Sequence, residues 1–590
     1  MFFFPPRLLH AVLLFGLLLI GQSSVSQVLV RQKTPTSYLE SDRVAPNAFD
    51  LPMRISPELA GGFAELRINH LHSGVDFKTQ KRVGVQIYAP ADGWVSRIRI
   101  SSFGFGYALY LDHANGFTTV YGHLQAYAEP IASVASSMQY KQESFELDTL
   151  LPVRRIPVKK GQLIAYSGNS GLSAAPHLHF EIRDSKTEET VDPLLWFCDR
   201  IKDDIAPKPY KVALFAIEGE GALSTGNSKA IVSVFNNKKG EWITGALPTA
   251  WGKIGLGLNA YDYMDNNANQ YGVCSIRLFL DNEVIFQQDL SRFSFEQTRY
   301  ANSLVDYEGW QRNHTWIMKS FLDPGNRLNV YPMLKDWGYV TINEQKKYSF
   351  RYELMDRAGN ATEFRFTVQG QKRTIPTKIF TGKKLIFWVP NYFSNTDFKL
   401  DIPAGTLCRT LDFQFKQIPD TGYSDVFKIH NPYIPLNKPI QACFRIHKDN
   451  LADKAHYYLA KVAENGQTSY VPSTYDNGWM VAELKDFGTY KVLSDTIRPK
   501  ISAPNLESMG KNSVIRIRIT DNASGIKSWR GSIDGKWALF ALDGKSGWLS
   551  YVLDSARVTS GREHELRLSI KDGCGNENCI TSTFSWARPY

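Results

Sequence analysis

The sequence predicts a mainly β protein that is divided into several domains. Its 590 residues correspond to about four domains of roughly 150 residues each. Aromatic residues make up 13% of the chain, and apolar and polar residues alternate in runs such as residues 513–519 (SVIRIRI). Successive side chains of a strand point to opposite faces, so this alternation is typical of a strand with one face in a core. We expect few long helices.

The chain begins with the features of an export signal. Arg7 precedes an apolar run over residues 8–21, and the small-residue pattern Ser24-Val25-Ser26 follows. A spanning helix needs about 20 apolar residues, so this shorter run suits a signal peptide better. We therefore predict a signal peptide over residues 1–26 and a location in the periplasm or elsewhere in the cell envelope. An uncleaved signal that anchors the protein in the membrane is the alternative.

Residues 27–58 form a polar lead-in, and strand and turn signals begin at residue 59. Residues 107–121 are predicted to form a β-hairpin around Asn115-Gly116, because a type I′ turn needs positive φ at both central positions. His113 lies beside this turn and is expected to be structural or exposed. The connection over residues 126–156 is long for a compact domain, so it is expected to be a lid or a binding loop, with disorder as the competing explanation.

Histidines are concentrated in one part of the chain. Six of the eleven that follow residue 26 lie between positions 70 and 179, namely His70, His72, His113, His123, His177 and His179. In the segment HSGVD, His72 and Asp76 are four residues apart, a spacing that shares one face on a helix and on a strand alike. In the segment HLHFE, His177 and His179 share one face of a strand and lie about 7 Å apart.

Two histidines and one aspartate can hold a zinc ion while its fourth tetrahedral position stays open for water, as in catalytic zinc sites. A closed structural site is less expected, because this region has no cysteine. The spacing does not choose between His70 and His72, which share a face if the chain is extended. Taken alone, His123 would be interpreted as a core histidine bonded to a backbone carbonyl.

The order of these segments resembles that of the lysostaphin-type zinc endopeptidases, which cut peptidoglycan peptides. The signatures of that family are HxxxD, then YGHL, then a Gly/Ser-rich turn that leads into HLHFE. They correspond here to residues 72–76, 121–124 (YGHL), 167–171 (SGNSG) and 177–181. The resemblance covers about residues 59–196 and implies the antiparallel β-sheet fold of that family for a zinc peptidase domain over residues 59–200.

The resemblance also implies a role for each residue. It gives His72, Asp76 and His179 to Zn²⁺, His177 to the general base, and His123 to the group that steadies the oxyanion or the water. Zinc lowers the pKa of its bound water from about 15.7 to about 7. An uncharged histidine that accepts a proton from this water contributes about 10²–10⁴-fold to the rate. Glu181 shares the strand face and is expected either beside the ligands or as an exposed carboxylate.

The remaining two thirds of the chain contain an internal repeat. The repeat is carried by three matches: residues 205–208 (IAPK) with 497–500 (IRPK), Asp265-Asn266 with Asp521-Asn522, and residues 356–360 (DRAGN) with 572–576 (DGCGN). Asp-Asn and Gly-Asn pairs are typical turn residues. We predict immunoglobulin-like β-sandwiches over residues 201–372 and 495–590, the first with an insertion around 293–345. Residues 375–494 are predicted to form a β domain of unknown type.

Charge and cysteine content exclude some classes of function. The 68 basic and 58 acidic residues give a net charge of +10, which is modest for this length, and no Lys/Arg block occurs, so nucleic acid is not an expected partner. Six cysteines are too few for a disulfide scaffold. Cys574 and Cys579 are close enough in sequence to bond in an oxidising compartment, with free thiols as the alternative.

Three functions are compatible with these patterns. The favoured one is an exported zinc endopeptidase that hydrolyses the peptide cross-links between peptidoglycan stem peptides. The second is a non-catalytic or autoinhibited envelope module that binds peptidoglycan or activates another hydrolase. In the third, the β-sandwiches bind envelope proteins while the zinc domain processes exported proteins. The complete set of ligand residues favours the first.

Overall fold

The computed structural model describes residues 28–30, 48–502 and 513–586, so the predicted signal peptide lies outside the described residues. Strands dominate and the few helices are short, which confirms the prediction of a mainly β protein. Within the described residues, no helix combines the length and the apolar character that crossing a bilayer requires. All six cysteines are free, so Cys574 and Cys579 do not form a disulfide.

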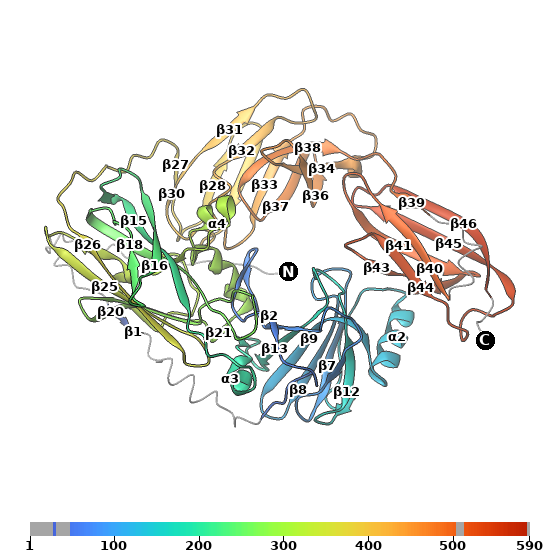
Figure 1. The fold of residues 1–590 in the computed structure, drawn as a ribbon. Coiled ribbons are helices and arrows are strands. Elements are labelled where there is room, and N and C mark those ends of the chain that lie inside the picture. The colour runs from blue at the N-terminus through green and yellow to red at the C-terminus, as the bar shows by residue number, and fades with distance from the viewer. Residues whose placement is uncertain (1–27, 31–47, 503–512, 587–590) are drawn as a thin grey trace, which may run out of the picture.

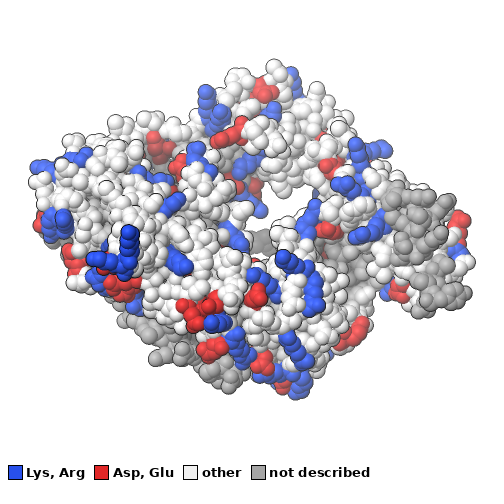
Figure 2. All heavy atoms as spheres, in the orientation of Figure 1, with Lys and Arg blue, Asp and Glu red and all other residues white. Residues whose placement is uncertain are grey.

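Four units follow one another around a ring (Figure 1). We name them the first unit (residues 48–200), the second unit (201–372), the third unit (375–494) and the fourth unit (495–586). The fourth unit, drawn in red, returns to the helix α2 of the first unit, drawn in blue. Basic and acidic side chains are interspersed over the face of the ring seen in Figure 2.

The first unit is built on one large antiparallel sheet of twelve strands, eleven of which are its own. These eleven strands are β2 (Leu59–Gly61), β5 (Val75–Lys78), β6 (Gln86–Tyr88), β7 (Gly93–Ile100), β8 (Tyr107–His113), β9 (Phe117–Tyr127), β10 (Leu147–Leu150), β11 (Pro157–Val158), β12 (Leu163–Ser167), β13 (His177–Asp184) and β14 (Thr190–Val191). The remaining elements are the hairpin β3 (Leu66–Arg67) and β4 (His70–Leu71), the helices α2 (Ile131–Gln142) and α3 (Leu194–Phe197), and the 3-10 helix η1 (Cys198–Arg200).

Strand β13 lies at the centre of this sheet, between β5 and β9. Its alternation is as predicted, because Leu178 and Phe180 are fully buried on the core side and the two histidines face the other way. The ring of Phe180 packs at 6.1 Å from that of Phe77 in β5 and at 5.5 Å from that of Tyr121 in β9. The core therefore fixes which face of β13 carries the histidines.

The hairpin predicted over residues 107–121 is formed by β8 and β9, but its turn is not of type I′. Of the two central residues only Gly116 has positive φ, at 85°. The N–H of Gly116 donates to the carbonyl oxygen of His113 at 3.2 Å, which closes the turn one residue earlier than predicted. A glycine in the left-handed region after such a turn is the usual way to make a slightly longer hairpin loop.

The long connection over residues 126–156 is ordered. Strand β9 runs on to Tyr127, α2 follows, and β10 then pairs with β7 and widens the sheet. The competing explanation of disorder is therefore wrong. The N-terminal side of the unit is also longer than predicted, because Phe49 and Met53 are buried in its core.

The second unit contains two six-stranded antiparallel sheets, and one of them is completed by β1 (Val28–Val30), which precedes the first unit in the chain and pairs with residues 333–335. Their other strands are β15 (Lys208–Leu223), β16 (Lys229–Asn236), β17 (Trp242–Thr244), β18 (Ala250–Tyr261), β19 (Ser275–Leu280), β20 (Glu283–Asp289), β22 (Met318–Lys319), β23 (Met333–Lys335), β24 (Val340–Ile342), β25 (Lys347–Met355) and β26 (Ala361–Gln369). The predicted insertion contains the 3-10 helices η2 (Phe295–Ser303) and η3 (Asp336–Gly338) and the helix α4 (Tyr307–Asn313).

The first and second units share one continuous core. Strand β21 (Arg292–Phe293) of the second unit pairs with β14 and completes the large sheet. The buried guanidinium of Arg357 contacts Asp192 of the first unit, with 2.7 Å between Nε and Oδ2. Removing one partner of a buried ion pair lowers the free energy of unfolding by about 3–5 kcal/mol. This pair therefore helps to hold the two units in one orientation.

The third and fourth units are each made of facing sheets around their own core. The third unit contains β27 (Lys383–Leu385), β28 (Asn391–Ser394), β29 (Phe398–Ile402), β30 (Leu411–Phe413), β31 (Phe415–Ile418), β32 (Val426–Ile429), β33 (Ile440–Arg445), the 3-10 helix η4 (Lys454–His456), β34 (Tyr457–Val462), β35 (Thr468–Val471), β36 (Ser473–Asp476), β37 (Trp479–Leu484) and β38 (Gly488–Ser494). The fourth contains β39 (Lys500–Ser502), β40 (Val514–Thr520), β41 (Ile526–Ile533), β42 (Lys536–Ala538), β43 (Ala541–Asp543), β44 (Trp548–Val552), β45 (Arg562–Asp572) and β46 (Glu577–Trp586). The immunoglobulin-like topology of the second and fourth units stays a prediction.

Gly74 lies in the turn that leads into β5, where the chain runs against β13. A Cβ added at Gly74 would lie 2.2 Å from the carbonyl oxygen of Phe180. Because this oxygen belongs to the backbone of the central strand, the clash can be relieved only by moving β5 away from β13.

We expect Gly74→Ala to lower the free energy of unfolding by about 1–3 kcal/mol or more, the cost of overpacking a well-packed site. Urea unfolding followed by tryptophan fluorescence measures this change. Gly272→Ala is the matched control, because its Cβ would meet no atom nearer than 3.8 Å. Equal unfolding midpoints for the two variants would contradict the close approach of β5 and β13.

Candidate metal centre

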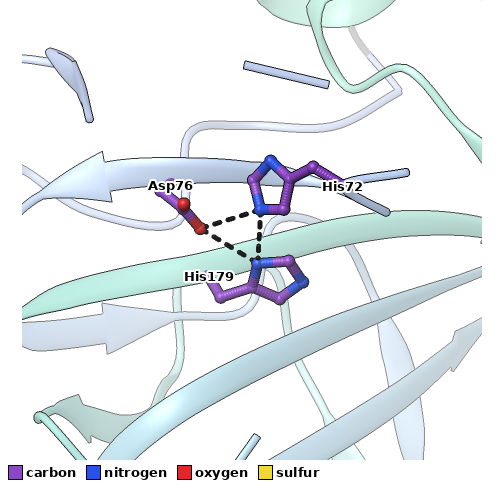
Figure 3. Close-up of side chains that lie close together, drawn as sticks. All are labelled: His72, Asp76 and His179. Carbon is purple, nitrogen blue, oxygen red and sulfur yellow. Dashed lines mark hydrogen bonds and ion pairs between the residues drawn. The ribbon is translucent and has the colours of Figure 1, made fainter. Parts of the chain in front are cut away.

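The three predicted metal ligands, His72, Asp76 and His179, converge on one point (Figure 3). His72 Nε2 lies 3.1 Å from Asp76 Oδ1 and 3.1 Å from His179 Nδ1. The third side of this triangle, from His179 Nδ1 to Asp76 Oδ1, is 3.0 Å. Both imidazoles are buried, and the side chain of Asp76 is 14% exposed. The structure therefore brings together the three residues that the sequence assigned to the metal.

The pairing of strands explains this convergence. His179 in β13 stands directly opposite Asp76 in β5 on one side and Gly122 in β9 on the other. Side chains of such directly opposed residues lie about 4.5–5.5 Å apart at Cβ. His72 joins them from the turn before β5, and the insertion of the second unit supports that turn, because Thr298 accepts the N–H of Leu71 at 2.9 Å.

The three atoms present lone pairs to the same point. His72 Nδ1 lies 2.6 Å from the carbonyl oxygen of Gly62, which can only accept, so Nδ1 carries the proton and Nε2 carries a lone pair. His179 Nε2 lies 2.9 Å from a carboxylate oxygen of Glu181, which leaves Nδ1 free to bind a metal. Ligands at 2.0–2.1 Å from a tetrahedral zinc are about 3.3 Å apart, so a triangle of 3.0–3.1 Å fits zinc closely.

Charges around the triangle favour a cation. Burial opposes the ionised carboxyl of Asp76, but the histidines that surround it hold its pKa well below the usual range. Burial also opposes the charged form of His179, yet its hydrogen bonds to Asp76 and Glu181 outweigh burial and raise its pKa to about 9. A proton shared between Asp76 and His179 would have to leave before a metal could bind to both.

Glu181 is the carboxylate that orients His179, and it is fully buried. The alternative of an exposed strand carboxylate is therefore wrong. Burial alone would raise its pKa, but the charge of Arg183 and the bond to His179 lower the pKa of Glu181 to about 2. Arg183 donates from Nε to Oε2 at 2.6 Å, and Ser73 donates its hydroxyl to Oε1. Such a carboxylate behind a ligating histidine fixes the ring and strengthens it as a ligand.

His177 lies beside the triangle, with Nε2 at 3.4 Å from Asp76 Oδ1. Its Nδ1 faces the carbonyl oxygen of Ala175 at 2.8 Å, so Nε2 presents a lone pair towards the centre. His123 is its neighbour, with ring centroids 4.7 Å apart. Both residues that the sequence assigned to catalysis thus border the candidate centre without joining the three ligand atoms.

The position of His123 depends on an irregularity in β9 that the sequence did not indicate. His123 has a φ of 58°, which is uncommon for a residue with a Cβ, and the pairing of β8 with β9 shifts register at this point. A bulge of this kind re-aims one side chain. The ring of His123 is buried, its Nδ1 lies 2.8 Å from the carbonyl oxygen of Ser170, and burial lowers its pKa to about 3.

The other two histidines of this region are not part of the centre. His70 is exposed in β4 and its Nδ1 faces the carbonyl oxygen of Ile68 at 2.8 Å, so the structure selects His72 over His70. His113 is buried and bonds through Nδ1 to the carbonyl oxygen of Asp92 and through Nε2 to Thr119, each at 2.9 Å. His113 is therefore structural, as predicted.

The fourth unit contacts the edge of the candidate centre. No feature of the sequence indicated this contact. Lys545, in the turn between β43 and β44, donates from Nζ to the carbonyl oxygens of Asn169 at 2.5 Å and Ser173 at 3.0 Å. These carbonyls belong to the loop that leads into His177. On the same side, the ring of Phe105 stacks on that of His179 with centroids 4.8 Å apart.

The long connection of the first unit is the second place where the fourth unit docks. The ring of Tyr140 in α2 lies 5.1 Å from that of Trp537, and the guanidinium carbon of Arg557 lies 3.3 Å from the centroid of Tyr140. Phe145, after the helix, lies 6.0 Å from Trp529. Residues 126–156 thus form a platform for the fourth unit and do not fold over the metal ligands.

The part of the chain that contains the candidate centre is similar to a known protein family. The pattern of peptidase family M23 matches residues 70–143 and 145–193, and that of a Zu5-like domain matches residues 383–495 in the third unit. An uncharacterized metalloprotease of Haemophilus influenzae is 36% identical over 110 residues, which are 19% of this chain and 18% of that protein. The DD-carboxypeptidase/endopeptidase Mpg of Neisseria meningitidis is 29% identical over 113 residues, or 19% of this chain and 20% of that protein.

The peptidoglycan DD-endopeptidase ShyB of Vibrio cholerae is 31% identical over 111 residues, again 19% of this chain and 20% of that protein. The chain thus spans about a fifth of the length of these relatives. Among solved structures, the catalytic domain of lysostaphin from Staphylococcus simulans is 25% identical, with a TM-score of 0.18 over 23% of this chain and 90% of that one. A zinc-containing peptidase of Vibrio cholerae is 26% identical, with a TM-score of 0.19 over 25% of this chain and 39% of that one. The part of this protein that matches peptidase family M23 thus lies within residues 70–193, and we call these residues the M23 domain.

Proposed function

We propose that the M23 domain is a zinc-dependent endopeptidase that hydrolyses peptide cross-links of bacterial peptidoglycan. The observation that carries the proposal is the triangle of His72, Asp76 and His179, whose lone pairs meet at one point with two further histidines beside it. The relative named peptidoglycan DD-endopeptidase ShyB supports the substrate class, and the relative named DD-carboxypeptidase/endopeptidase Mpg supports the reaction. The export signal predicted from the sequence supports a location in the periplasm or elsewhere in the cell envelope, where this substrate occurs.

Each residue around the centre would have its own role in hydrolysis. A zinc ion held by the three ligands would polarise the substrate carbonyl and acidify a water. His177 would accept a proton from that water at Nε2, since its Nδ1 is engaged with the carbonyl oxygen of Ala175. Once protonated, His177 has an N–H at Nε2 that it can give to the leaving amine, so one residue serves as base and then as acid.

His123 is better suited to the water than to the oxyanion. Its Nδ1 donates to the carbonyl oxygen of Ser170, and its pKa of about 3 keeps the ring neutral near pH 7. Nε2 of such a ring is an acceptor only, so it can receive a hydrogen bond from a water but cannot donate one to an oxyanion. Of the two roles proposed from the sequence, we retain the orientation of the attacking water.

A second candidate function is the autoinhibited module, and the contact of Lys545 favours it. The fourth unit bonds to the loop over residues 169–173 and also packs against α2, so it is held beside the centre at two places. A peptidoglycan strand is bulky, and access to His177 from this side requires the fourth unit to leave or to form part of the binding groove. The β-sandwich units would then be the partners of other envelope proteins.

The assigned roles predict different losses in Asp76→Ala and His177→Ala. Asp76→Ala removes one of three ligands and is expected to lose the zinc. His177→Ala is expected to keep about one zinc per chain and to release muropeptides about 10²–10⁴-fold more slowly, the usual contribution of a general base. Metal analysis and chromatography of digested peptidoglycan measure both. Zinc retained in Asp76→Ala, or full activity in His177→Ala, would contradict the assignment.

Glu181→Gln is expected to weaken zinc binding about 10–100-fold while the fold is kept, because the uncharged amide is a poorer acceptor for His179. Competition with a chromophoric chelator measures the dissociation constant. Glu188→Gln is the matched control: Glu188 also binds Arg183, at 3.2 Å, but its side chain is 63% exposed. If both variants bind zinc equally well, Glu181 does not act through His179.

The activity of Lys545→Ala tests whether the fourth unit restricts access of substrate to the candidate centre. If the fourth unit restricts access, loss of the two bonds to the loop is expected to raise muropeptide release several-fold at unchanged zinc content. Lys536→Ala, an exposed lysine of the same unit, is the control. Unchanged or lower activity in Lys545→Ala would remove the support for autoinhibition.

A further inference from the structure

Three aspartates gather in the second unit, and three gather again in the fourth unit, and neither cluster shares a residue with the candidate metal centre. The first cluster is Asp203, Asp262 and Asp356, and the second is Asp495, Asp521 and Asp572. In each cluster one carboxylate oxygen of every member lies within 4.8 Å of the other two. We call them the second-unit cluster and the fourth-unit cluster.

The two clusters occupy equivalent places in the two units. In each, the first aspartate precedes the first strand, before Lys208 of β15 in one unit and before Lys500 of β39 in the other. Asp262 and Asp521 directly follow the strands β18 and β40, and the third aspartate lies at the end of β25 or β45. In each unit, the three carboxylates therefore lie at strand ends on the same edge.

The structure corrects one match of the internal repeat. The sequence paired Asp265 with Asp521, but Asp262 takes the equivalent place. The loop after Asp262 is longer than its counterpart, and the backbone pairing of Asp262 with Tyr271 shows where the chain returns. This extra loop contains the pair Asp265-Asn266, which a sequence comparison therefore matches to Asp521-Asn522.

The same hydrogen bonds hold both clusters. Asn360 Nδ2 donates to Oδ2 of Asp356 and to the backbone carbonyl of Asp203, each at 2.9 Å. In the fourth unit, Asn576 Nδ2 donates to Oδ2 of Asp572 at 2.8 Å and to the carbonyl of Asp495 at 3.0 Å. The carboxylates are thus fixed in position by neutral donors, which leave their negative charge uncompensated.

One carboxylate of each cluster has an oxygen that nothing satisfies. Asp262 is only 5% exposed, its carboxylate lies against those of Asp203 and Asp356, and its Oδ1 has no hydrogen-bond partner. Oδ1 of the equivalent Asp521 is buried and has no partner either. A buried acceptor without a partner costs about 1–3 kcal/mol, more when it is charged, so the same unpartnered oxygen in both clusters favours a ligand at this place.

The charges of the clusters favour a cation as this ligand. Among the described residues, no lysine, arginine or histidine forms an ion pair with any of the six aspartates. Burial and the charges of Asp356 and Asp203 raise the pKa of Asp262 to about 8. Burial likewise raises the pKa of Asp203 to about 6. The three carboxylates repel one another, and a cation between them would remove the repulsion.

We propose that each cluster binds one calcium ion. The donors are all oxygen, with neither imidazole nor thiolate, and hard divalent cations bind to such a set. Ca²⁺ accepts six to eight oxygens in flexible geometry, and three carboxylates from separate strand ends leave room for carbonyls and water, whereas Mg²⁺ requires a near-ideal octahedron. The sites are separate from the zinc centre and do not depend on the proposed peptidase activity.

Each calcium would stiffen a junction between units. Asp203 lies directly after the first unit, and Asp495 lies directly after the third. Beside the fourth-unit cluster, Tyr470 of the third unit donates to the carbonyl oxygen of Gly573 at 3.4 Å. Calcium at Asp495 would therefore fix the angle at which the fourth unit leaves the third and reaches the loop bound by Lys545.

Equilibrium dialysis of the full-length, zinc-loaded protein against about 1 mM CaCl₂, the weak end of the range for extracellular calcium modules, tests the proposal. We expect two calcium ions per wild-type chain, one in Asp262→Asn, one in Asp521→Asn and none in the double variant. Asp265→Asn is the control and is expected to keep two, because Asp265 ion-pairs with Lys202 outside the cluster.

Thermal unfolding separates loss of binding from loss of folding. Calcium is expected to raise the unfolding midpoint of the wild type, and Asp262→Asn is expected to show a smaller rise. In calcium-free buffer Asp262→Asn should unfold at the same temperature as the wild type or above it, because the amide replaces a carboxyl whose ionisation this site disfavours. A wild type that binds no calcium, or variants that still bind two ions, would overturn the proposal.

Discussion

The antiparallel pairing of β13 with β5 and β9 is the constraint on which the rest of the centre depends. It sets His179 opposite Asp76 on one side and opposite Gly122 on the other, and it leaves Leu178 and Phe180 in the core. A shift of one residue would move both histidines of β13 into the core, which the packing of Phe180 prevents. The hydrophobic core thus sets the geometry of the polar centre.

The polar centre is supported by groups that belong to several parts of the chain. Glu181 and Arg183 continue β13 behind His179, and the carbonyl of Gly62 fixes the ring of His72. The insertion of the second unit braces the turn before β5 through Thr298. Because the first and second units share one core, the candidate metal ligands are held by a body larger than the M23 domain itself.

The ring arrangement gives the fourth unit a part in the environment of the centre. Its contacts with Tyr140 and Phe145 and with the loop before His177 come from residues about 400 positions away along the chain. The aspartate clusters lie at the junctions that orient the second and fourth units. Under the calcium proposal, the position of the fourth unit against the M23 domain would depend on the stiffness of those junctions.

The sequence by itself determined the mainly β fold, because strand alternation is a local property. The order HxxxD, YGHL, HLHFE indicated the three residues of the candidate metal centre only through the family that it resembles. Spacing alone did not choose between His70 and His72 as the metal ligand. Nor did the sequence indicate the bulge that orients His123 or the complete burial of Glu181. Lys545 and Asp262 were also beyond it, since their roles arise from contacts between distant segments and from a loop of unexpected length. Tertiary structure decided these because pKa, exposure and hydrogen-bond partners depend on what surrounds a side chain, and most of those surroundings are remote in sequence.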